Sequence, residues 1–482
     1  MSVAIRAVVL AASLCFSGVA MAHERDWGAA LRSDADAMRR IYNESHPGAV
    51  DPANPEFNKQ LTDIHAAAYA RSHTVRNQAD YELGVRAMGA AFNDGHAGTY
   101  PSRQLPKLTN YWTGFVLRSV NGELRVALRE DGAAPPLDAR LMSCDGIAAD
   151  RLYEQRVGTY NPLFSLEARR ARLGGRLLLQ YGEPSLDDRP KRCIFQQGTE
   201  SKSYDLTWRP HPDIGPLLTK AAQSFVAPIE RRVLPDGTIW ISAGTFNNIP
   251  GSDVSTRLAN LVSSIEHDPS LRDAPRVVLD VRGNGGGDSL WSYRMAQALF
   301  GADYVEAVAP ASEGIDWRPS SDNIAHFERL LEGWRKEAEP NTQSIEWVTK
   351  VLAGMKAAKA SGATFWREID APRTKSSSAL RSQYAGRAIV LVDGACGSAC
   401  LDAVDVWKAA GAVLVGRETA ADSLYMDVRY ETLPSGMATL AIPTKVYRGR
   451  QRGSNEPYRP DHVWNGGMND TPALEKWIVA LP

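Results

Sequence analysis

A short apolar strand that ends in a run of glycines constrains this chain more than any other feature. The segment from Arg276 to Gly287 reads RVVLDVRGNGGG. Its β-branched residues, bounded by polar ones, are typical of a buried strand. The glycines let another group approach the main-chain N–H groups, as an anion site or an oxyanion hole requires. The alternative is a plain tight turn into a helix, which the pattern predicts over 289–300.

A second unit of the same kind follows about a hundred residues later. The segment from Ala388 to Cys400 reads AIVLVDGACGSAC and leads into a predicted helix over 401–410. Nucleophilic serines tend to lie at the mouth of such a turn, directly before a helix, and Ser398 occupies that position. Capping of the helix is the alternative role for this serine.

Taken together, the two strand-turn-helix units resemble the core of the tail-specific (C-terminal processing) serine peptidases, the superfamily that also holds the tricorn core and the retinoid-binding repeats. The resemblance covers most of the chain after residue 22. It implies an α/β fold with a crotonase-like (ClpP/crotonase) core of repeated ββα units, an N-terminal helical cap and a PDZ-like β module. It also implies hydrolysis of peptide bonds, with a peptide or unfolded protein as substrate and no metal or organic cofactor.

The resemblance also implies which side chains complete the site. The segment around His96, Asn93-Asp94-Gly95-His96, resembles the Asp-x-His segment that supplies the histidine base in the tricorn-like branch, although Ala97 stands where a hydroxyl residue usually follows. The segment 452–461 resembles one in which a glutamate precedes a Pro-Asp pair. It implies that Glu456 is the carboxylate that orients the base.

The absence of the lysine that serves as base in the Ser/Lys branch of the family also supports His96 as the base. In the Ser/Lys branch a general-base lysine lies three residues after a threonine, whereas here Thr419 is followed at that spacing by Asp422. A serine hydroxyl needs a base to be nucleophilic near neutral pH. We therefore expect His96 to accept the proton of Ser398.

The oxyanion of the reaction intermediate needs hydrogen-bond donors beside the nucleophile. We expect the backbone N–H groups of Gly285, Gly286 and Ala399 to stabilise it.

The pattern of the first 22 residues predicts that the protein is exported from the cytoplasm. They contain one basic residue, Arg6, then an apolar run over 7–20, and end in Ala20-Met21-Ala22. The run is shorter than the roughly 20 residues of a spanning helix, and the small-x-small ending fits a cleaved secretory signal. The expected location is the periplasm or the exterior. No later segment is apolar enough to span a membrane.

Composition adds limits on partners. The length of 482 residues allows two or three domains of roughly 100–200 residues. The formal net charge of −1 offers no basic face for nucleic acid and no polybasic patch for lipid. The sequence is compatible with a homo-oligomer as well as with a monomer.

Four cysteines follow the signal, an even number in a compartment that permits disulfides. We expect Cys144 to pair with Cys193 and Cys396 with Cys400. Positions i and i+4 at a helix start lie about 6 Å apart, inside the usual Cα range of a disulfide, so the second bridge would brace the turn of Ser398. Buried free thiols are the alternative. Zinc is disfavoured because no second Cys/His pair stands at ligand spacing.

Three regions follow from these patterns. Helical spacing over 34–42, 57–70 and 80–92 predicts an N-terminal cap over 23–100 that carries the candidate base. Alternating strands and a hairpin at Asn121-Gly122 predict a degenerate PDZ-like domain over 107–212, which would bind a peptide C-terminus. A purely structural β module is the alternative. The peptidase core would span 213–482.

An insertion of about 302–385 interrupts the predicted core. Amphipathic helices are expected over 323–337 and 345–360, as a lid or a dimer contact. The insertion also carries four tryptophans: Trp317, Trp334, Trp347 and Trp366. Tryptophans in such a region are more often packing residues than platforms for a substrate.

Two other functions remain compatible with the sequence. A periplasmic binding protein on the same fold could use the tryptophan-bearing insertion to hold an apolar ligand. An esterase with the same serine would hydrolyse esters without cleaving peptides.

Overall fold

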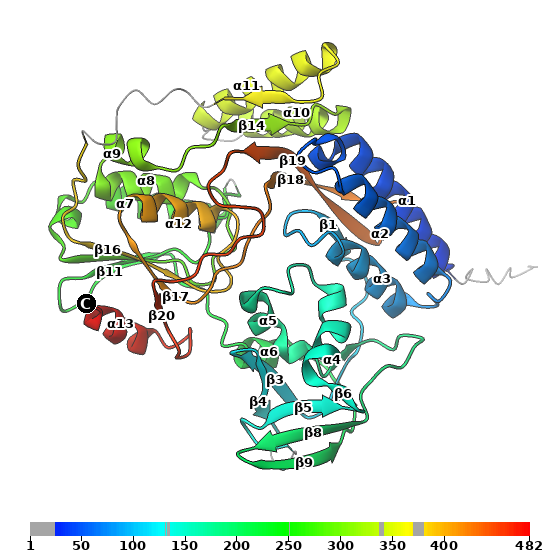
Figure 1. Ribbon diagram of the computed structural model, residues 1–482. Coiled ribbons are helices and arrows are strands. Elements are labelled where there is room, and N and C mark those ends of the chain that lie inside the picture. Colours follow the sequence, from blue (N-terminus) through cyan, green and yellow to red (C-terminus); the bar gives the residue numbers. More distant parts are fainter. Residues whose placement is uncertain (1–24, 131, 133–134, 250, 337–341, 370–379) are drawn as a thin grey trace, which may run out of the picture.

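The computed structural model describes residues 25–130, 132, 135–249, 251–336, 342–369 and 380–482. The expected secretory signal over 1–22 lies outside these residues. The chain has a mixed α/β fold with three parts: an α/β core, a set of N-terminal helices on an antiparallel sheet, and a β-rich module (Figure 1). Within the described ranges, no helix combines the length and apolarity needed to cross a membrane.

The core is a six-stranded sheet in which the two motif strands are neighbours. Its strands, in spatial order, are β11 (Glu230–Val233), β12 (Ile239–Ser242), β13 (Arg276–Asp280), β16 (Arg387–Val392), β17 (Val413–Gly416) and β20 (His462–Val463). Only β11 runs antiparallel to its neighbour. Because parallel strands end at the same sheet edge, the turns after β13 and β16 lie side by side. Both predicted strands are confirmed.

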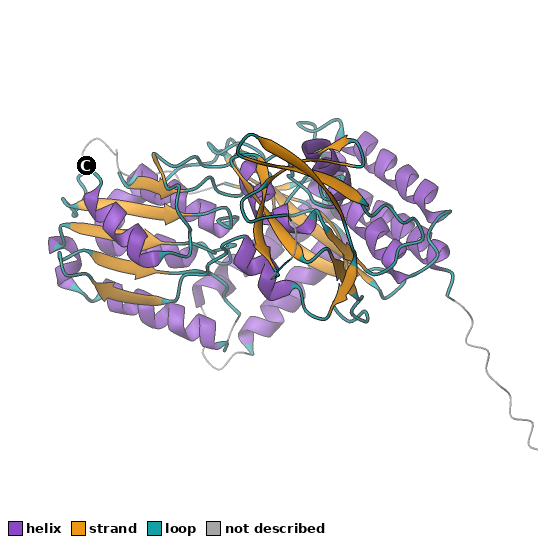
Figure 2. Cartoon of the chain, turned by 90° about the horizontal axis from the view of Figure 1, so that it is seen from below, coloured by secondary structure: helices purple, strands orange, loops and turns teal. Residues whose placement is uncertain are grey.

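Helices cover both faces of this sheet (Figure 2). On β13, Val277 and Leu279 pack in the cluster that contains α7 (Asp253–Glu266), α8 (Leu290–Phe300) and α12 (Ala399–Ala409). Val278, between them, packs on the opposite face with α13 (Thr471–Ala480). This double burial explains why the strands are continuous apolar runs. The helices predicted after the two turns are α8 and α12.

The N-terminal helices pack on a second sheet. The three helices are α1 (Trp27–Ser45), α2 (Phe57–Ser72) and α3 (Gln78–Ala90), which confirms the helical pattern of this region. The antiparallel sheet contains β1 (Gly98–Pro101), β14 (Gly314–Trp317), β15 (Trp366–Glu368), β18 (Tyr425–Thr432) and β19 (Ala438–Arg448). The helices share one apolar cluster with β19. Since β1 pairs with β19, the residues just before β1 are fixed against a late part of the chain.

The β-rich module lies between the first helices and the core in sequence. Its larger sheet contains β3 (Phe115–Val120), β4 (Glu123–Arg129), β5 (Arg140–Cys144), β6 (Ile147–Ala148), β8 (Arg192–Gln197) and β9 (Glu200–Asp205). Its smaller sheet contains β2 (Asn110–Trp112), β7 (Leu179–Tyr181) and β10 (Arg209–His211). Its helices are α4 (Ala149–Arg156), α5 (Glu167–Leu173) and α6 (Gly215–Ala221).

Two local predictions within the module are confirmed. Asn121 and Gly122 both have positive φ, 49° and 78°, as a two-residue hairpin of type I′ requires. Cys144 and Cys193 stand opposite each other on β5 and β8 and form a disulfide.

The insertion forms helices with a small core of their own. After α9 (Ala302–Val308), the helices α10 (Ser321–Arg335) and α11 (Thr342–Ala360) confirm the predicted amphipathic pair. Trp317 is fully buried, and the other three tryptophans of this region pack against the same cluster. These tryptophans are therefore packing residues of the insertion.

A buried histidine makes stability depend on pH. His46 has no exposed surface, stacks on Phe57, and its Nδ1 accepts a hydrogen bond of 2.9 Å from the Gly48 N–H. Burial lowers the pKa of His46 from 6.5 to about 3. Below pH 6.5 the unfolded state therefore binds more protons than the folded state, so this contribution to stability is lost progressively as the pH falls toward 3.

We expect this histidine to cost about 2–3 kcal/mol of unfolding free energy on going from pH 6.5 to about pH 4.5. The measurement is urea unfolding at both pH values for the wild type and for His46→Asn, which keeps an acceptor for Gly48 but does not titrate. The wild type should lose more stability than the variant by this amount. An identical loss in both proteins would contradict the prediction.

Candidate active site

Ser398 stands in a strained turn between β16 and α12. Its φ of 54° and ψ of −127° lie in a region that residues with a side chain rarely adopt. Although Ser398 is the N-cap residue of α12, its side chain makes no capping hydrogen bond, so the alternative role as a helix cap is wrong. A strained, half-buried serine with an uncommitted hydroxyl is a typical nucleophile of a strand-turn-helix unit.

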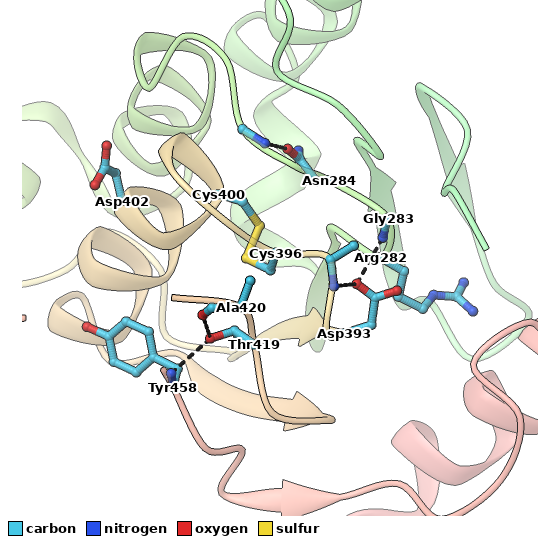
Figure 3. The surroundings of a disulfide bond; sticks show 12 residues. Arg282, Gly283, Asn284, Asp393, Cys396, Cys400, Asp402, Thr419, Ala420 and Tyr458 are labelled. Atoms are coloured by element: carbon cyan, nitrogen blue, oxygen red, sulfur yellow. Dashed lines mark hydrogen bonds between the residues drawn. A yellow bond between two sulfur atoms is a disulfide. The ribbon is translucent and has the colours of Figure 1, made fainter. Parts of the chain in front are cut away.

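A disulfide encloses this serine. Cys396 and Cys400 are bonded, with their Cα atoms 5.3 Å apart and both side chains buried, which confirms the expected pair. Figure 3 shows the bridge beside Thr419 and Ala420. The bond ties the turn that precedes Ser398 to the first turn of α12.

Two residues, Asp393 and Asn284, connect the glycine turn and the serine turn. Asp393, at the end of β16, accepts hydrogen bonds from the Gly283 N–H at 3.1 Å and the Ala395 N–H at 3.0 Å (Figure 3). Burial raises the pKa of Asp393, and these two backbone hydrogen bonds oppose the rise.

Asn284 provides the second link. It is fully buried; its Nδ2 donates to the Ala243 carbonyl at 2.7 Å and its Oδ1 accepts from the Gly286 N–H at 2.8 Å. Its own carbonyl accepts from the Gly397 N–H at 3.4 Å. Sequence reasoning assigned no role to Asn284, although it is the only residue with a side chain among the glycines of this turn.

The expected oxyanion donors are not equivalent. The Gly286 N–H already donates to Asn284, whereas the N–H groups of Gly285 and Ala399 have no acceptor within the described part of the chain. A Cβ atom on Gly286 would lie 2.8 Å from the Cβ of Ser398 and 3.0 Å from the Ala399 nitrogen. The glycine turn therefore lies directly against the serine, and the N–H groups of Gly285 and Ala399 are available as donors beside it.

This close approach makes Gly286→Ala a sharp test. Besides those contacts, the new methyl group would lie 2.8 Å from the Gly397 carbonyl oxygen, at a φ of 105° that disfavours alanine. We expect kcat/KM to fall by about 10²-fold, because the serine and the amides would be displaced by a fraction of an ångström or more. Gly198→Ala is the control, since Gly198 also has a positive φ but no atom within 4 Å. Equal kinetics of the two variants would contradict the expectation.

His96 is held by a short turn just before β1. Its N–H donates to Asp94 Oδ1 at 2.7 Å, and the Ala97 N–H donates to the same oxygen at 3.3 Å. Burial raises the pKa of Asp94, while the hydrogen bond from the His96 backbone opposes the rise. The His96 Nδ1 atom is buried and has no hydrogen-bond partner within the described chain.

The segment after Thr419 lies between the histidine and the serine. A Cβ atom on Gly95 would lie 3.6 Å from the Ala421 carbonyl oxygen, and one on Gly397 would lie 3.7 Å from the Ala420 Cβ. The residues next to His96 and next to Ser398 therefore contact adjacent residues of one short segment. Within the described ranges, no hydrogen bond joins the two side chains themselves.

Asp422 lies in the same segment and is a buried carboxylate. Its Oδ1 pairs with Arg450 at 3.1 Å and with Arg452, while its Oδ2 is buried and has no partner in the described chain. Burial raises the pKa of Asp422, and the charges of Arg452, Arg450 and His96 oppose the rise. The charge of the candidate base thus acts on the Asp422 carboxylate.

Glu456 is placed differently. It is exposed, and its Oε2 accepts a hydrogen bond of 3.0 Å from the Gly453 N–H in its own turn. The neighbouring Asn455 donates to the Asn93 carbonyl at 2.9 Å, so the segment does border the histidine turn. No contact of Glu456 with His96 is found among the described residues, and its role as the orienting carboxylate stays a prediction.

The chemistry of this site belongs to one class of enzyme. A serine in a strained turn, two free amides beside it and a histidine across a short segment define a serine hydrolase on an α/β core. Over residues 241–462, from β12 to β20, the sequence matches the model of peptidase family S41. The matched segment carries the glycine turn and Ser398, so the chain is a serine-type peptidase whose core is similar to family S41.

Solved structures share the fold over nearly the whole chain. Mature CPAF superposes with a TM-score of 0.59 at 13% sequence identity, covering 91% of this chain and 93% of that chain. Mature CPAF complexed with lactacystin gives a TM-score of 0.58 at 13% identity and covers 94% and 98% of the two chains. No curated protein sequence matches the chain. In the described part of the chain, no group of three or more His, Cys, Asp or Glu side chains could hold a metal ion.

Proposed function

We propose that this peptidase acts outside the cytoplasm, with Ser398 as the nucleophile and His96 as the general base. The observation that carries the assignment is the strained turn of Ser398. Its side chain makes no capping hydrogen bond, and it lies against a glycine turn in which the Gly285 N–H has no acceptor among the described residues. Export is supported by the secretory signal expected over 1–22 and by the two disulfides, which persist in oxidising compartments.

The reaction follows from these positions. Ser398 Oγ attacks the peptide carbonyl carbon while His96 takes its proton, and the resulting oxyanion accepts hydrogen bonds from the Gly285 and Ala399 N–H groups. His96 then gives the proton to the leaving amine, and the peptide bond breaks. Water hydrolyses the acyl-enzyme by the same steps in reverse. The histidine must approach the serine for this, and such contacts commonly tighten only when substrate is bound.

The carboxylate that supports the base is proposed to be Asp422, and Glu456 is the competing candidate. Asp422 is buried, its Oδ2 has no partner among the described residues, and the charge of His96 acts on its carboxylate. A negative charge there would stabilise the imidazolium that forms when Ser398 loses its proton.

The finer architecture is part of the proposal. Parallel β12, β13, β16 and β17 with helices on both faces are compatible with a crotonase-like core over 213–482. The helices over 23–100 would form a cap, and the module over 107–212 a PDZ-like domain that delivers peptide ends.

A labelling experiment tests the assignment. A fluorophosphonate that reacts with activated serines should label the oxidised protein at Ser398, located by peptide mass spectrometry, and His96→Ala should abolish labelling. Mass analysis of products from an unfolded protein substrate should show new ends that are absent with Ser398→Ala. Labelling at another residue, or cleavage that survives Ser398→Ala, would refute the proposal.

A further inference from the structure

The disulfide between Cys396 and Cys400 spans the candidate nucleophile, which lies midway between its two ends. The bonded residues are four apart in sequence, whereas the disulfide between Cys144 and Cys193 joins residues separated by 49. A cross-link stabilises a fold mainly by restricting the unfolded chain, and it does so more strongly when it closes a longer loop. The short bridge therefore adds less to global stability, and a local role explains its position at Ser398 better than a global one.

The turn under the bridge has few contacts that could hold it. Ser398 has a φ of 54°, a conformation that persists only where the surroundings enforce it. Gly397, directly before it, is loosely surrounded, since the nearest atoms beyond its chain neighbours would lie 3.7 Å from a Cβ built there. Its N–H reaches the Asn284 carbonyl at a distance of 3.4 Å, which is long for a hydrogen bond. Gly397 therefore offers little resistance if Ser398 relaxes.

Both ends of the bridge are anchored in the core (Figure 3). The Cys396 N–H donates to the Asp393 carbonyl at 3.0 Å, and Cys400 lies in the first turn of α12. Both cysteines belong to the apolar cluster between the sheet and α7, α8 and α12. Two unbonded sulfur atoms need more space between them than bonded ones, and a close-packed interior provides none without movement. Breaking the bond would therefore push the start of the turn away from α12.

Such a movement would affect two parts of the site at once. Ala399 lies between Ser398 and Cys400, and its N–H has no acceptor among the described residues. A Cβ atom on Gly286 would lie 2.8 Å from the Cβ of Ser398 and 3.0 Å from the Ala399 nitrogen, so the nucleophile and this amide share one close contact. Reacting groups must be held within about half an ångström of the productive geometry. The bridge therefore controls the attacking oxygen and a donor to the oxyanion together.

We propose that Cys396 and Cys400 are positioning residues of the peptidase: their disulfide holds Ser398 and the Ala399 amide in the reactive arrangement. The chain thus becomes fully active only when it folds under oxidising conditions. A chain that folds with both thiols reduced has the same fold but a low kcat. This inference rests on the proposed function, because it takes Ser398 as the nucleophile.

Formation of the bridge needs an oxidant, which is the disulfide of a small thiol such as glutathione or of a thiol-exchange protein. One cysteine thiolate attacks a sulfur of that disulfide, forms a mixed disulfide and releases one partner thiol. The second cysteine thiolate then attacks the sulfur of the first, and the second partner thiol leaves. The chain loses two electrons and two protons, and the partner gains them. Because both cysteines are fully buried in the folded protein, we expect this exchange during folding.

Removal of each bridge separates a local role from a global one. The test variant is Cys396→Ala/Cys400→Ala, and the matched control is Cys144→Ala/Cys193→Ala, which also removes a buried bridge. We expect the test variant to lower kcat by about 10- to 100-fold with KM within about twofold, because the attacking oxygen is displaced and the rest of the binding surface is not. The control should keep kcat, although it should unfold at a lower urea concentration than the test variant. Initial rates on a fluorogenic peptide and urea unfolding measure these quantities.

Reduction breaks the same bridge without leaving a cavity. In residues 23–482 of the Cys144→Ala/Cys193→Ala variant, Cys396 and Cys400 are the only cysteines. This protein is unfolded in urea with dithiothreitol and refolded either in dithiothreitol or in oxidised and reduced glutathione. We expect both forms to have the same circular dichroism spectrum, and the reduced form to react with a fluorophosphonate about 10- to 100-fold more slowly. Refolding the reduced sample with oxidised glutathione should restore the rate.

Three results would overturn the inference. The first is an equal kcat in the two double variants, whether both are normal or both are lowered. The second is an equal labelling rate in the reduced and oxidised forms. The third is failure of both the test variant and the reduced protein to fold, which would give the bridge a structural role. If the oxidised wild type neither cleaves peptides nor reacts with the fluorophosphonate at Ser398, the proposed function fails instead.

Discussion

Replacing Ser398 with alanine is expected to lower kcat by about 10⁶-fold, to the level that binding and the free amides alone support. The hydroxyl supplies the atom that attacks the substrate, and no other serine stands in a comparable turn within the described chain. Because its side chain makes no capping bond, its removal should leave the unfolding free energy within about 0.5 kcal/mol of wild type. Initial rates on a fluorogenic peptide, together with urea unfolding, measure both quantities.

The companion variants sharpen this test. His96→Ala should cause a loss of similar size, and the double variant should be no slower than either single one, since the two groups act as one unit. Ser454→Ala, at an exposed position, is the control and should retain full activity. Losses that multiply in the double variant would show that His96 acts independently of Ser398, and the proposed pair would be wrong.

Asp422→Asn is expected to damage both stability and catalysis. Asp422 shares one oxygen between Arg450 and Arg452, and all three side chains are at most 9% exposed. Removing the negative charge leaves two buried cations without this partner, which we expect to cost about 3–5 kcal/mol of unfolding free energy. In the fraction that remains folded, kcat should fall by about 10⁴-fold if the carboxylate supports the imidazolium, as in other serine hydrolases.

Glu456→Gln separates the two candidate carboxylates. Glu456 is exposed and contacts only its own turn among the described residues, so we expect kcat within about threefold of wild type. Rates are compared at a temperature where unfolding curves show each protein to be folded. A large loss in Glu456→Gln with normal kcat in Asp422→Asn would instead support the glutamate as the orienting residue.

The core could be predicted from sequence because its signals are local. β13 and β16 are continuous apolar runs, since helices bury both of their faces. The glycines that follow β13 identify the turn from the sequence alone. The disulfide between Cys396 and Cys400 followed from their spacing along one helix start. The spatial order of the strands and the packing of α1 to α3 on β19 depend on partners far away in the chain, and no local pattern encodes them.

In the candidate site, too, features with a local sequence signal could be predicted, and features that depend on distant residues could not. Ser398 and the glycine turn were found because each lies in its own motif. The environment of Asp422 was not found, because its arginine partners follow it by about thirty residues and become neighbours only after β18 and β19 form a hairpin.

The position of the candidate base His96 depends on a late part of the chain. His96 precedes β1, and β1 gains its place by pairing with β19, which is made after almost all of the core. In a chain that ends before β19, the candidate base His96 would have no sheet edge to hold it near the candidate nucleophile Ser398. We therefore expect peptidase activity only from chains that include β19, so that unfinished chains would not cleave one another.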